Sequence, residues 1–255
     1  MTVFNPSRAF DAVIFDLGGT LIFFDGEWPE ILRQADQALF NSLESAGLRL
    51  DRERFLGQFR DEMETYYRER DTEFIEHTTR YILREILKEW GYGALPEPVL
   101  RSALEATYAV TQAYWMTEVD SHPVLQDLSR QGYRLGLISN AGDDADVQVL
   151  VDKANLRGYF DFILTSADLG IRKPNPRIFE IGLERWKLPA GRVAMVGDTR
   201  GADILGAQLS GLAGIWITRR ADTPANQAHS NTILPDAEIS TLSQLPELLL
   251  NYPGK

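Results

Sequence analysis

The segment "VIFDLGGTLI", residues 13–22, is an apolar run that ends at a carboxylate, Asp16, and continues into two glycines. An apolar run without alternating polar residues is typical of a parallel strand that is covered on both faces. In an open α/β sheet, ligands bind beyond the carboxyl ends of such strands. The segment therefore predicts a buried strand that holds a candidate nucleophile, Asp16, at the edge of a sheet.

Four further apolar runs indicate strands of the same kind. From the second run onward, helical patterns such as "DADVQVLVDKANL" and "PRIFEIGLERWKL" lie between them. Alternating strands and helices predict an α/β fold with a Rossmann-like open parallel sheet. The four runs are "RLGLIS" (134–139), "FDFILTS" (160–166), "RVAMVG" (192–197) and "LAGIWIT" (212–218).

Residues 26–118 break this alternation, because they carry four consecutive amphipathic helical patterns. Asp51 suits the N-cap of the second pattern, and Gly91 suits the end of the third. Four such helices bury their apolar faces against one another in a bundle. We therefore predict a helical cap domain over residues 26–118, inserted into a core domain of residues 1–25 and 119–255.

The composition excludes several classes of function. Acidic residues outnumber basic ones by 37 to 26, and the net charge of −11 opposes binding to nucleic acid. A small phosphorylated metabolite stays compatible with this charge, since one bound cation can dominate the local field. The chain has no cysteine, which excludes disulfides and thiolate chemistry.

The sequence also indicates where the protein acts. Its beginning, "MTVFNPSRAFD", does not resemble a signal peptide, and no apolar run approaches the roughly 20 residues that span a bilayer. We expect a cytoplasmic protein without membrane or nucleic-acid partners, present as a monomer or a homodimer.

Polar residues gather at the ends of three predicted strands: Asp16, Ser139 with Asn140, and Asp198. Asp203 follows Asp198 by about one turn, within "VGDTRGADILGA". Two convergent carboxylates suit Mg²⁺, which prefers hard oxygen ligands. The alternative for Asp203 is that it only complements the dipole of the following helix.

Lys173 lies in "GIRKPNPRIF", where Pro174 and Pro176 restrict the backbone and can hold an ammonium in place. A carboxylate nucleophile, a Mg²⁺ site, an ammonium and small hydrogen-bond donors together indicate phosphoryl transfer. The covalent intermediate expected from these groups is an aspartyl-phosphate on Asp16.

The segments "FDLGGTL", "LISN", "KPNPRIF" and "VGDTRGADILGA" resemble, in order, the four motifs of the haloacid dehalogenase-like (HAD) hydrolases. The resemblance implies a Rossmann-like core, a mobile helical cap, Mg²⁺ as cofactor and phosphate binding by Ser139 and Lys173. It also implies that the metal binds side chains of motifs one and four and the carbonyl of Gly18. The predicted site comprises catalytic Asp16 and Lys173, substrate-binding Ser139, Asn140 and Thr20, and metal ligands Asp16, Gly18, Asp198 and Asp203.

Gly18 departs from the pattern of the phosphatases that the chain resembles, which carry a second aspartate there. That aspartate protonates the leaving group and then activates water, help that is worth roughly 10²–10⁴-fold. Our first hypothesis is a Mg²⁺-dependent phosphatase for a small phosphorylated metabolite with a good leaving group. Asp25 or Glu27, which follow the motif, could also act through a water molecule.

Three alternatives remain open. A 2-haloacid dehalogenase also lacks the second aspartate, but it needs no metal, whereas this chain retains "GDTRGAD". A phosphonoacetaldehyde hydrolase has alanine there and needs a cap lysine for a Schiff base, for which Lys88 is the only candidate in the insert. A non-catalytic phosphate- or protein-binding domain is the third, although only one motif position is altered.

Overall fold

The core is a six-stranded parallel sheet with the strand order β5-β4-β1-β6-β7-β8. The computed structural model describes residues 8–253, apart from the side chains of residues 71–73. All four residues of the central strand β1 are buried, as expected for an uninterrupted apolar run. The strands are β1 (Ala12–Phe15), β4 (Arg134–Ser139), β5 (Phe162–Thr165), β6 (Val193–Gly197), β7 (Ala213–Ile217) and β8 (Ala237–Ile239).

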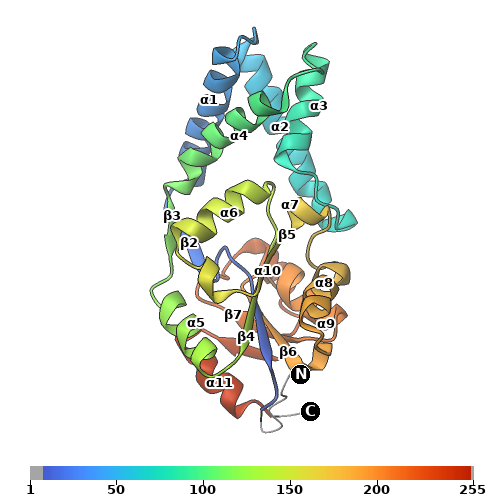
Figure 1. Ribbon diagram of the computed structural model, residues 1–255. Helices are drawn as coiled ribbons and strands as arrows, with labels where there is room; N and C mark the ends of the chain where they lie inside the picture. The colour runs from blue at the N-terminus through green and yellow to red at the C-terminus, as the bar shows by residue number, and fades with distance from the viewer. Residues whose placement is uncertain (1–7, 254–255) are drawn as a thin grey trace.

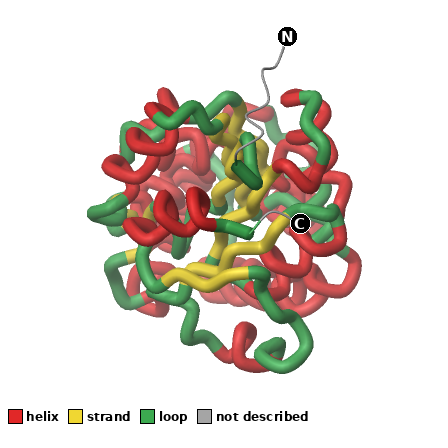
Figure 2. The backbone as a smooth tube through the Cα atoms, turned by 90° about the horizontal axis from the view of Figure 1, so that it is seen from below, coloured by secondary structure: helices red, strands yellow, loops and turns green. Residues whose placement is uncertain are grey.

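Helices cover both faces of this sheet, as Figure 2 shows from below. Val13 and Phe15 of β1 point to one face and pack with residues of α5, α6 and α11. Ala12 and Ile14 point to the other face and pack with α8 and α9, because successive side chains of a strand alternate. These helices are α5 (Ser121–Arg130), α6 (Asp144–Lys153), α8 (Pro176–Trp186), α9 (Leu205–Leu209) and α11 (Leu245–Asn251).

Short helical segments complete the core. They lie in connections between strands and helices, where they turn the chain within a few residues. They are η1 (Arg157–Tyr159), α7 (Ser166–Leu169), η2 (Ala190–Arg192), the π-helical η3 (Arg200–Ile204), α10 (Pro224–Ala228) and η4 (Leu242–Gln244).

Four longer helices form an insert with its own apolar cluster, at the top of Figure 1. Asp51 caps α2 as predicted, accepting a hydrogen bond from the amide of Arg54 at 3.0 Å. No helix within residues 8–253 is both long enough and apolar enough to cross a bilayer. The insert consists of α1 (Trp28–Ser45), α2 (Arg52–Glu73), α3 (Thr79–Glu89) and α4 (Glu97–Gln112).

Some elements differ from the sequence prediction. The apolar periodicity of the third pattern starts at Ile75, and a helix was predicted from there. The helix begins only at Thr79, because the Thr78 hydroxyl accepts the amide hydrogen of Tyr81 at 3.1 Å and caps it. The antiparallel pair β2 (Ile22–Phe24) and β3 (Trp115–Thr117), which links core and insert, was not predicted. Neither was β8. Strands of three residues carry too little periodicity to be recognised.

One end of the insert is seated on the core through a buried polar cluster. The carboxylate of Glu76, in the loop between α2 and α3, accepts hydrogen bonds from Tyr66 and from the hydroxyl of Ser166, the latter at 2.7 Å. Arg172 of the core donates to the Tyr66 hydroxyl at 3.2 Å and lies 3.7 Å from Glu76. A buried carboxylate needs such partners, so this loop is held against the core by specific contacts.

A second contact joins α4 of the insert to α6 of the core. The amide of Gln112 donates to Asp146 at 2.8 Å, and Arg101 lies 3.4 Å from Asp143. Burial raises the pKa of Asp146 to about 6, the Gln112 hydrogen bond lowers it and the neighbouring Asp143 raises it. The ionised form of Asp146 is therefore disfavoured in the folded protein.

Gly57 in α2 and Gly206 in α9 should respond oppositely to alanine. Nothing lies within 4 Å of a Cβ at Gly57, so Gly57→Ala should stabilise the protein by about 0.5–1 kcal/mol. At Gly206 a Cβ would lie 2.5 Å from the buried Phe179 ring and 3.2 Å from Cα of Pro174, so Gly206→Ala should destabilise by about 1–3 kcal/mol. Denaturant unfolding measures both effects, and a Gly206→Ala protein as stable as the wild type would contradict the packing.

Asp146→Asn should stabilise the protein at neutral pH, because asparagine keeps the acceptor for Gln112 and carries no charge. The folded pKa of Asp146 is about 6, above the ordinary value of 3.8. The contribution of protonated Asp146 to the stability of the folded protein is therefore fully present below about pH 4 and is lost as the pH rises through 6. We expect a gain of about 1–3 kcal/mol at pH 7.5 that disappears near pH 4, measured by denaturant unfolding. Asp152→Asn on the exposed side of α6 is the control. A less stable Asp146→Asn protein at pH 7.5 would refute this account.

Candidate active site

The site lies where the strand order of the sheet reverses. The chain runs from β1 to β4 and β5 on one side and places β6, β7 and β8 on the other. Asp16 follows β1 directly and Asp198 follows β6, and these strands are neighbours with Phe15 paired to Val196. The amide of Asp16 donates to the carbonyl of Val196 at 2.9 Å. Two carboxylates thus leave adjacent strands at the crevice where open sheets bind ligands.

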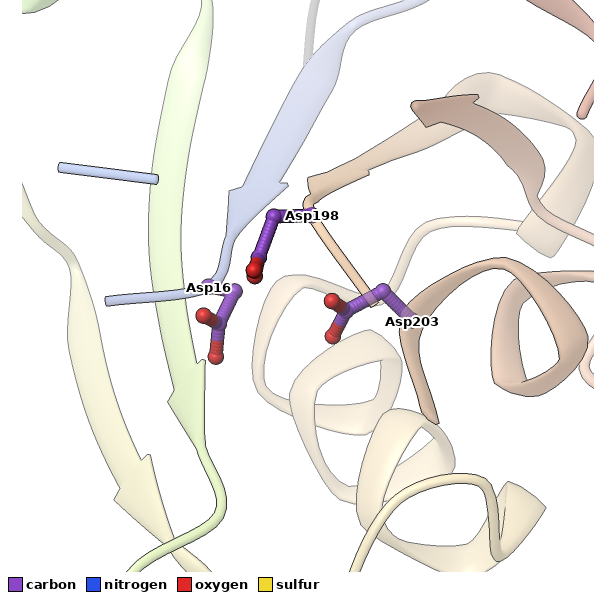
Figure 3. Close-up of side chains that lie close together, drawn as sticks. All are labelled: Asp16, Asp198 and Asp203. Atoms are coloured by element: carbon purple, nitrogen blue, oxygen red, sulfur yellow. The ribbon is translucent and has the colours of Figure 1, made fainter. Parts of the chain in front are cut away.

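Three carboxylates converge in this crevice (Figure 3). One oxygen each of Asp16, Asp198 and Asp203 lies within 4.8 Å of the others. Asp203 comes from η3, and its Oδ2 accepts the amide hydrogen of Thr199 at 2.9 Å. Asp16 and Asp203 are buried, whereas Asp198 is half-buried. The structure therefore brings together the three side chains that were predicted as metal ligands.

Two glycines make room for these carboxylates. A Cβ at Gly19 would lie 2.5 Å from Oδ2 of Asp198, and its φ of +78° also favours glycine. A Cβ at Gly197 would lie 2.3 Å from the Asp203 carboxylate. Any side chain at either position would push a carboxylate out of the cluster.

The ammonium of Lys173 connects two of the three carboxylates. Its Nζ donates to Oδ1 of Asp16 and to Oδ1 of Asp203, each at 2.6 Å, and to the carbonyl of Ile138 at 2.8 Å. The side chain of Asn140 holds the backbone of Lys173 in a reciprocal pair, accepting from its amide at 2.8 Å and donating to its carbonyl at 2.9 Å. Asn140 thus fixes the lysine, and its predicted contact with substrate stays a prediction.

The electrostatics of the cluster follow from burial and mutual repulsion. Burial raises the pKa of Asp16 to about 6, while Lys173 lowers it and Asp203 raises it. The pKa of Asp198 is raised well above its usual value by burial and by the charges of Asp16 and Asp203. Burial acts to lower the pKa of Lys173, but its two carboxylate partners outweigh burial and raise it. The lysine is therefore a fixed positive charge.

The donor set fits a divalent cation. When all four groups are ionised, three carboxylates and one ammonium leave an excess of two negative charges in a space where the carboxylates already repel one another. Their ligand atoms are hard oxygens, which Mg²⁺ prefers, and one carboxylate, Asp198, is open enough for the cation to keep some of its water. Asp16, Asp198 and Asp203 could hold Mg²⁺ here.

Thr20 and Ser139 lie on the two strand ends that flank the lysine. Ser139, the last residue of β4, and Thr20, in the turn after Asp16, are both buried. Within residues 8–253, no group forms a hydrogen bond with the Thr20 hydroxyl, which leaves a buried donor available. Their predicted contacts with substrate stay predictions.

The space beside Gly18 is occupied by Trp115 of β3, a residue that the sequence prediction did not include. A Cβ at position 18 would lie 3.2 Å from Cη2 of this indole. Trp115 also packs edge-on against Phe24 and Trp28, with ring centroids 5.5 Å and 6.3 Å away. Its role has no sequence signal, because 97 positions separate it from Gly18 along the chain.

The other candidate side chains lie at the surface. Asp25 and Glu27 are exposed between β2 and α1. Lys88 is exposed on α3 and forms an ion pair with Glu85 at 3.3 Å. It lies nine residues, or about 13 Å of helix, beyond Thr79, the residue of α3 that contacts the core through Gly142. This position argues against Lys88 as a Schiff-base lysine.

Comparison with known proteins places these features in a family. Residues 10–211 match the model for haloacid dehalogenase-like hydrolases. The chain is 29% identical over 239 residues to the glyceraldehyde 3-phosphate phosphatase of Methanothermobacter thermautotrophicus, covering 93% of this chain and 99% of that one. It is 36% identical over 124 residues to the pyrimidine 5'-nucleotidase YjjG of Escherichia coli, a match that spans only 48% of this chain and 52% of the relative.

A solved structure is similar over almost the full length. The 2-haloacid dehalogenase of Pseudomonas syringae pv. Tomato DC3000 has a TM-score of 0.67 and 27% identity, covering 96% of this chain and 100% of that one. The family match spans most of the chain, and the core sheet and the carboxylate at the end of β1 agree with it. This chain therefore belongs to the haloacid dehalogenase-like hydrolases and is a hydrolase.

Proposed function

We propose that this hydrolase is a Mg²⁺-dependent phosphatase that acts on a small phosphorylated metabolite through an aspartyl-phosphate on Asp16. The observation that carries the proposal is the cluster of Asp16, Asp198 and Asp203, whose oxygens lie within 4.8 Å beside the ammonium of Lys173. Hydrolysis of a phosphate ester needs a nucleophile and positive charge for the phosphoryl oxygens, and this cluster can supply both.

The reaction takes two displacements at phosphorus. In the first, an Asp16 carboxylate oxygen bonds to phosphorus, the ester P–O bond breaks, and the leaving group departs with that electron pair. In the second, water attacks phosphorus, the bond between Asp16 and phosphorus breaks, and inorganic phosphate leaves. With a pKa of about 6, Asp16 is ionised at neutral pH and ready to attack.

Positive charge has to accompany the substrate into the site. Lys173 provides a fixed charge next to Asp16, because its two hydrogen bonds to carboxylates hold Nζ in place. Mg²⁺ bound by Asp16, Asp198 and Asp203, and by the carbonyl of Gly18, would neutralise phosphoryl oxygens that otherwise repel the nucleophile. Asn140 keeps the lysine backbone in position.

The relatives support phosphate esters as the substrate class. One relative is named a glyceraldehyde 3-phosphate phosphatase and another a pyrimidine 5'-nucleotidase. The similarity to a dehalogenase structure concerns the fold. A dehalogenase needs no metal, whereas the three convergent carboxylates of Asp16, Asp198 and Asp203 suit one. We expect the protein to release phosphate from members of a panel of sugar phosphates, triose phosphates and nucleoside monophosphates. The assay is run with and without Mg²⁺.

Asp16→Asn should abolish turnover, because an amide cannot form the acyl phosphate. We expect a loss on the order of 10⁴-fold or more in kcat, with an unchanged circular dichroism spectrum. Asp198→Ala and excess EDTA should each suppress phosphate release, and Mg²⁺ should restore it after EDTA. Asp152→Asn, an exposed carboxylate on α6, is the matched control and should keep wild-type activity. Full activity in EDTA, or chloride release from 2-chloropropionate, would overturn the proposal.

Position 18 should decide which leaving groups the enzyme tolerates. Without an acid there, the leaving group must depart unprotonated, so we expect kcat/KM to fall steeply as its pKa rises. The backbone of Gly18 does not have a positive φ, and the nearest obstacle to a side chain is the tip of the Trp115 indole. A carboxylate at position 18 therefore requires a smaller residue at position 115.

The double variant Gly18→Asp with Trp115→Leu gives the added carboxylate this room, and Trp115→Leu alone is its control. We expect the added carboxylate to raise kcat/KM for an alkyl phosphate by about 10²-fold, the lower end of general acid–base effects, and to raise it less for p-nitrophenyl phosphate. Equal gains on both substrates, or no gain on either, would show that Gly18 serves another purpose.

A further inference from the structure

The backbone carbonyl of Asp198 is held by two side chains from outside its own loop. The indole N–H of Trp216, on β7, donates to this oxygen at 2.8 Å. The amide of Asn226, on α10, donates to the same oxygen at 2.8 Å. Two donors on one carbonyl fix the peptide that follows Asp198, and with it the direction in which the carboxylate leaves the strand.

Asn226 connects both ends of the turn between β6 and η3. Its Oδ1 accepts the amide hydrogen of Arg200 at 2.8 Å, and its second amide hydrogen goes to the carbonyl of Ala221 at 2.9 Å. The side chain is buried, and three of its four hydrogen-bonding positions are used. These partners fix the position of the side chain, because each broken hydrogen bond would leave a buried polar group unpaired.

The connection that carries Asn226 is held in place by hydrogen bonds of its own. Residues 218–236 link β7 to β8 and contain α10. Thr223 caps this helix, because its hydroxyl accepts the backbone amide hydrogen of Asn226 at 3.2 Å. Arg200 ties the same connection down by donating to the carbonyl of Ile233 at 2.6 Å, and its guanidinium lies 3.7 Å from the Trp216 ring centroid. The connection is thus fastened to Asp198 and to Arg200, the first residue of η3.

We infer that Asn226 is a positioning residue for the Mg²⁺ site, acting through the backbone of Asp198 and Arg200. This inference rests on the proposed metal site. Asp198 lies among like charges that act to push its carboxylate away, since one oxygen each of Asp16, Asp198 and Asp203 lies within 4.8 Å of the others. The hydrogen bonds of Asn226 and Trp216 oppose that displacement, so the ligand is pre-arranged before a cation binds.

Asn226→Leu tests the inference, because leucine has a similar size and forms no hydrogen bond. Isothermal titration of the full chain with MgCl₂ should show a Kd about 10–100-fold higher than in the wild type, the usual effect of losing a residue that supports a metal ligand. In the phosphatase assay, the Mg²⁺ concentration for half-maximal activity should rise by the same factor. The kcat at saturating Mg²⁺ should stay near the wild-type value.

Two further variants separate positioning from general stability. Trp216→Phe removes the other donor to the Asp198 carbonyl and keeps a ring beneath Arg200, so it should also raise the Kd for Mg²⁺. Gln208→Ala removes a 2.6 Å hydrogen bond from α9 to Leu234 in the same connection without touching residues 198–203, and it should leave the Kd unchanged. If Asn226→Leu does not fold, Asn226→Ser replaces it, with folding checked by circular dichroism.

The outcomes are distinct. A folded Asn226 variant that binds Mg²⁺ as tightly as the wild type overturns the inference, even if its melting temperature falls. A wild type that binds Mg²⁺ but releases no phosphate overturns the proposed phosphatase alone, while the shift in Kd still supports Asn226. A wild type without Mg²⁺ binding overturns the metal site and the inference together.

Discussion

Three carboxylates share a buried crevice in this protein, and the positive charge among them is the constraint on which the site depends. Asp16, Asp198 and Asp203 lie within 4.8 Å of one another, and the ammonium of Lys173 bonds to two of them. Burial and mutual repulsion would protonate or separate carboxylates so placed. The lysine offsets part of this repulsion, and the remaining negative charge is what makes the crevice suitable for a divalent cation.

The sheet supplies the geometry that this electrostatic arrangement needs. Asp16 and Asp198 directly follow the parallel strands β1 and β6 and therefore lie at the same edge of the sheet. The Ile138 carbonyl of β4 accepts the third hydrogen bond of Lys173. Further support comes from segments far away in sequence, since Trp216 and Asn226 fix the carbonyl of Asp198. Asp16, the proposed nucleophile, is thus surrounded by backbone and side chains that hydrogen bonds hold in place. Few of these groups would have to reorganise during a reaction.

The insert lies against this end of the sheet, together with the strand pair that links it to the core. Its α2–α3 loop rests on the core through Glu76, and β3 places the Trp115 indole beside Gly18. Gly18 stands at the position where the phosphatases that the chain resembles carry an aspartate, and the Trp115 indole fills the space beside it. For the proposed phosphatase, the leaving group then has to depart without a proton. Substrate choice by the proposed phosphatase then depends on leaving-group stability as well as on shape.

Much of the fold and the centre of the site could be predicted from the sequence. Uninterrupted apolar runs predicted five of the six parallel strands, and the carboxylates that follow β1 and β6 were expected to meet because parallel strands end at one edge. The periodic apolar residues of the insert predicted its four helices, with Asp51 as a cap. These features depend on local periodicity and on strand direction, which a sequence displays.

Only the tertiary structure decided the contacts between segments that are distant along the chain. Trp115 beside Gly18 and Asn226 on the Asp198 carbonyl join loops whose approach depends on how the connections after β2 and β7 pack. The reciprocal hydrogen bonds between the Asn140 side chain and the backbone of Lys173 were likewise not predicted. A side chain's partners are set by the space and the unpaired groups around it, and a pattern of residue types does not contain that information.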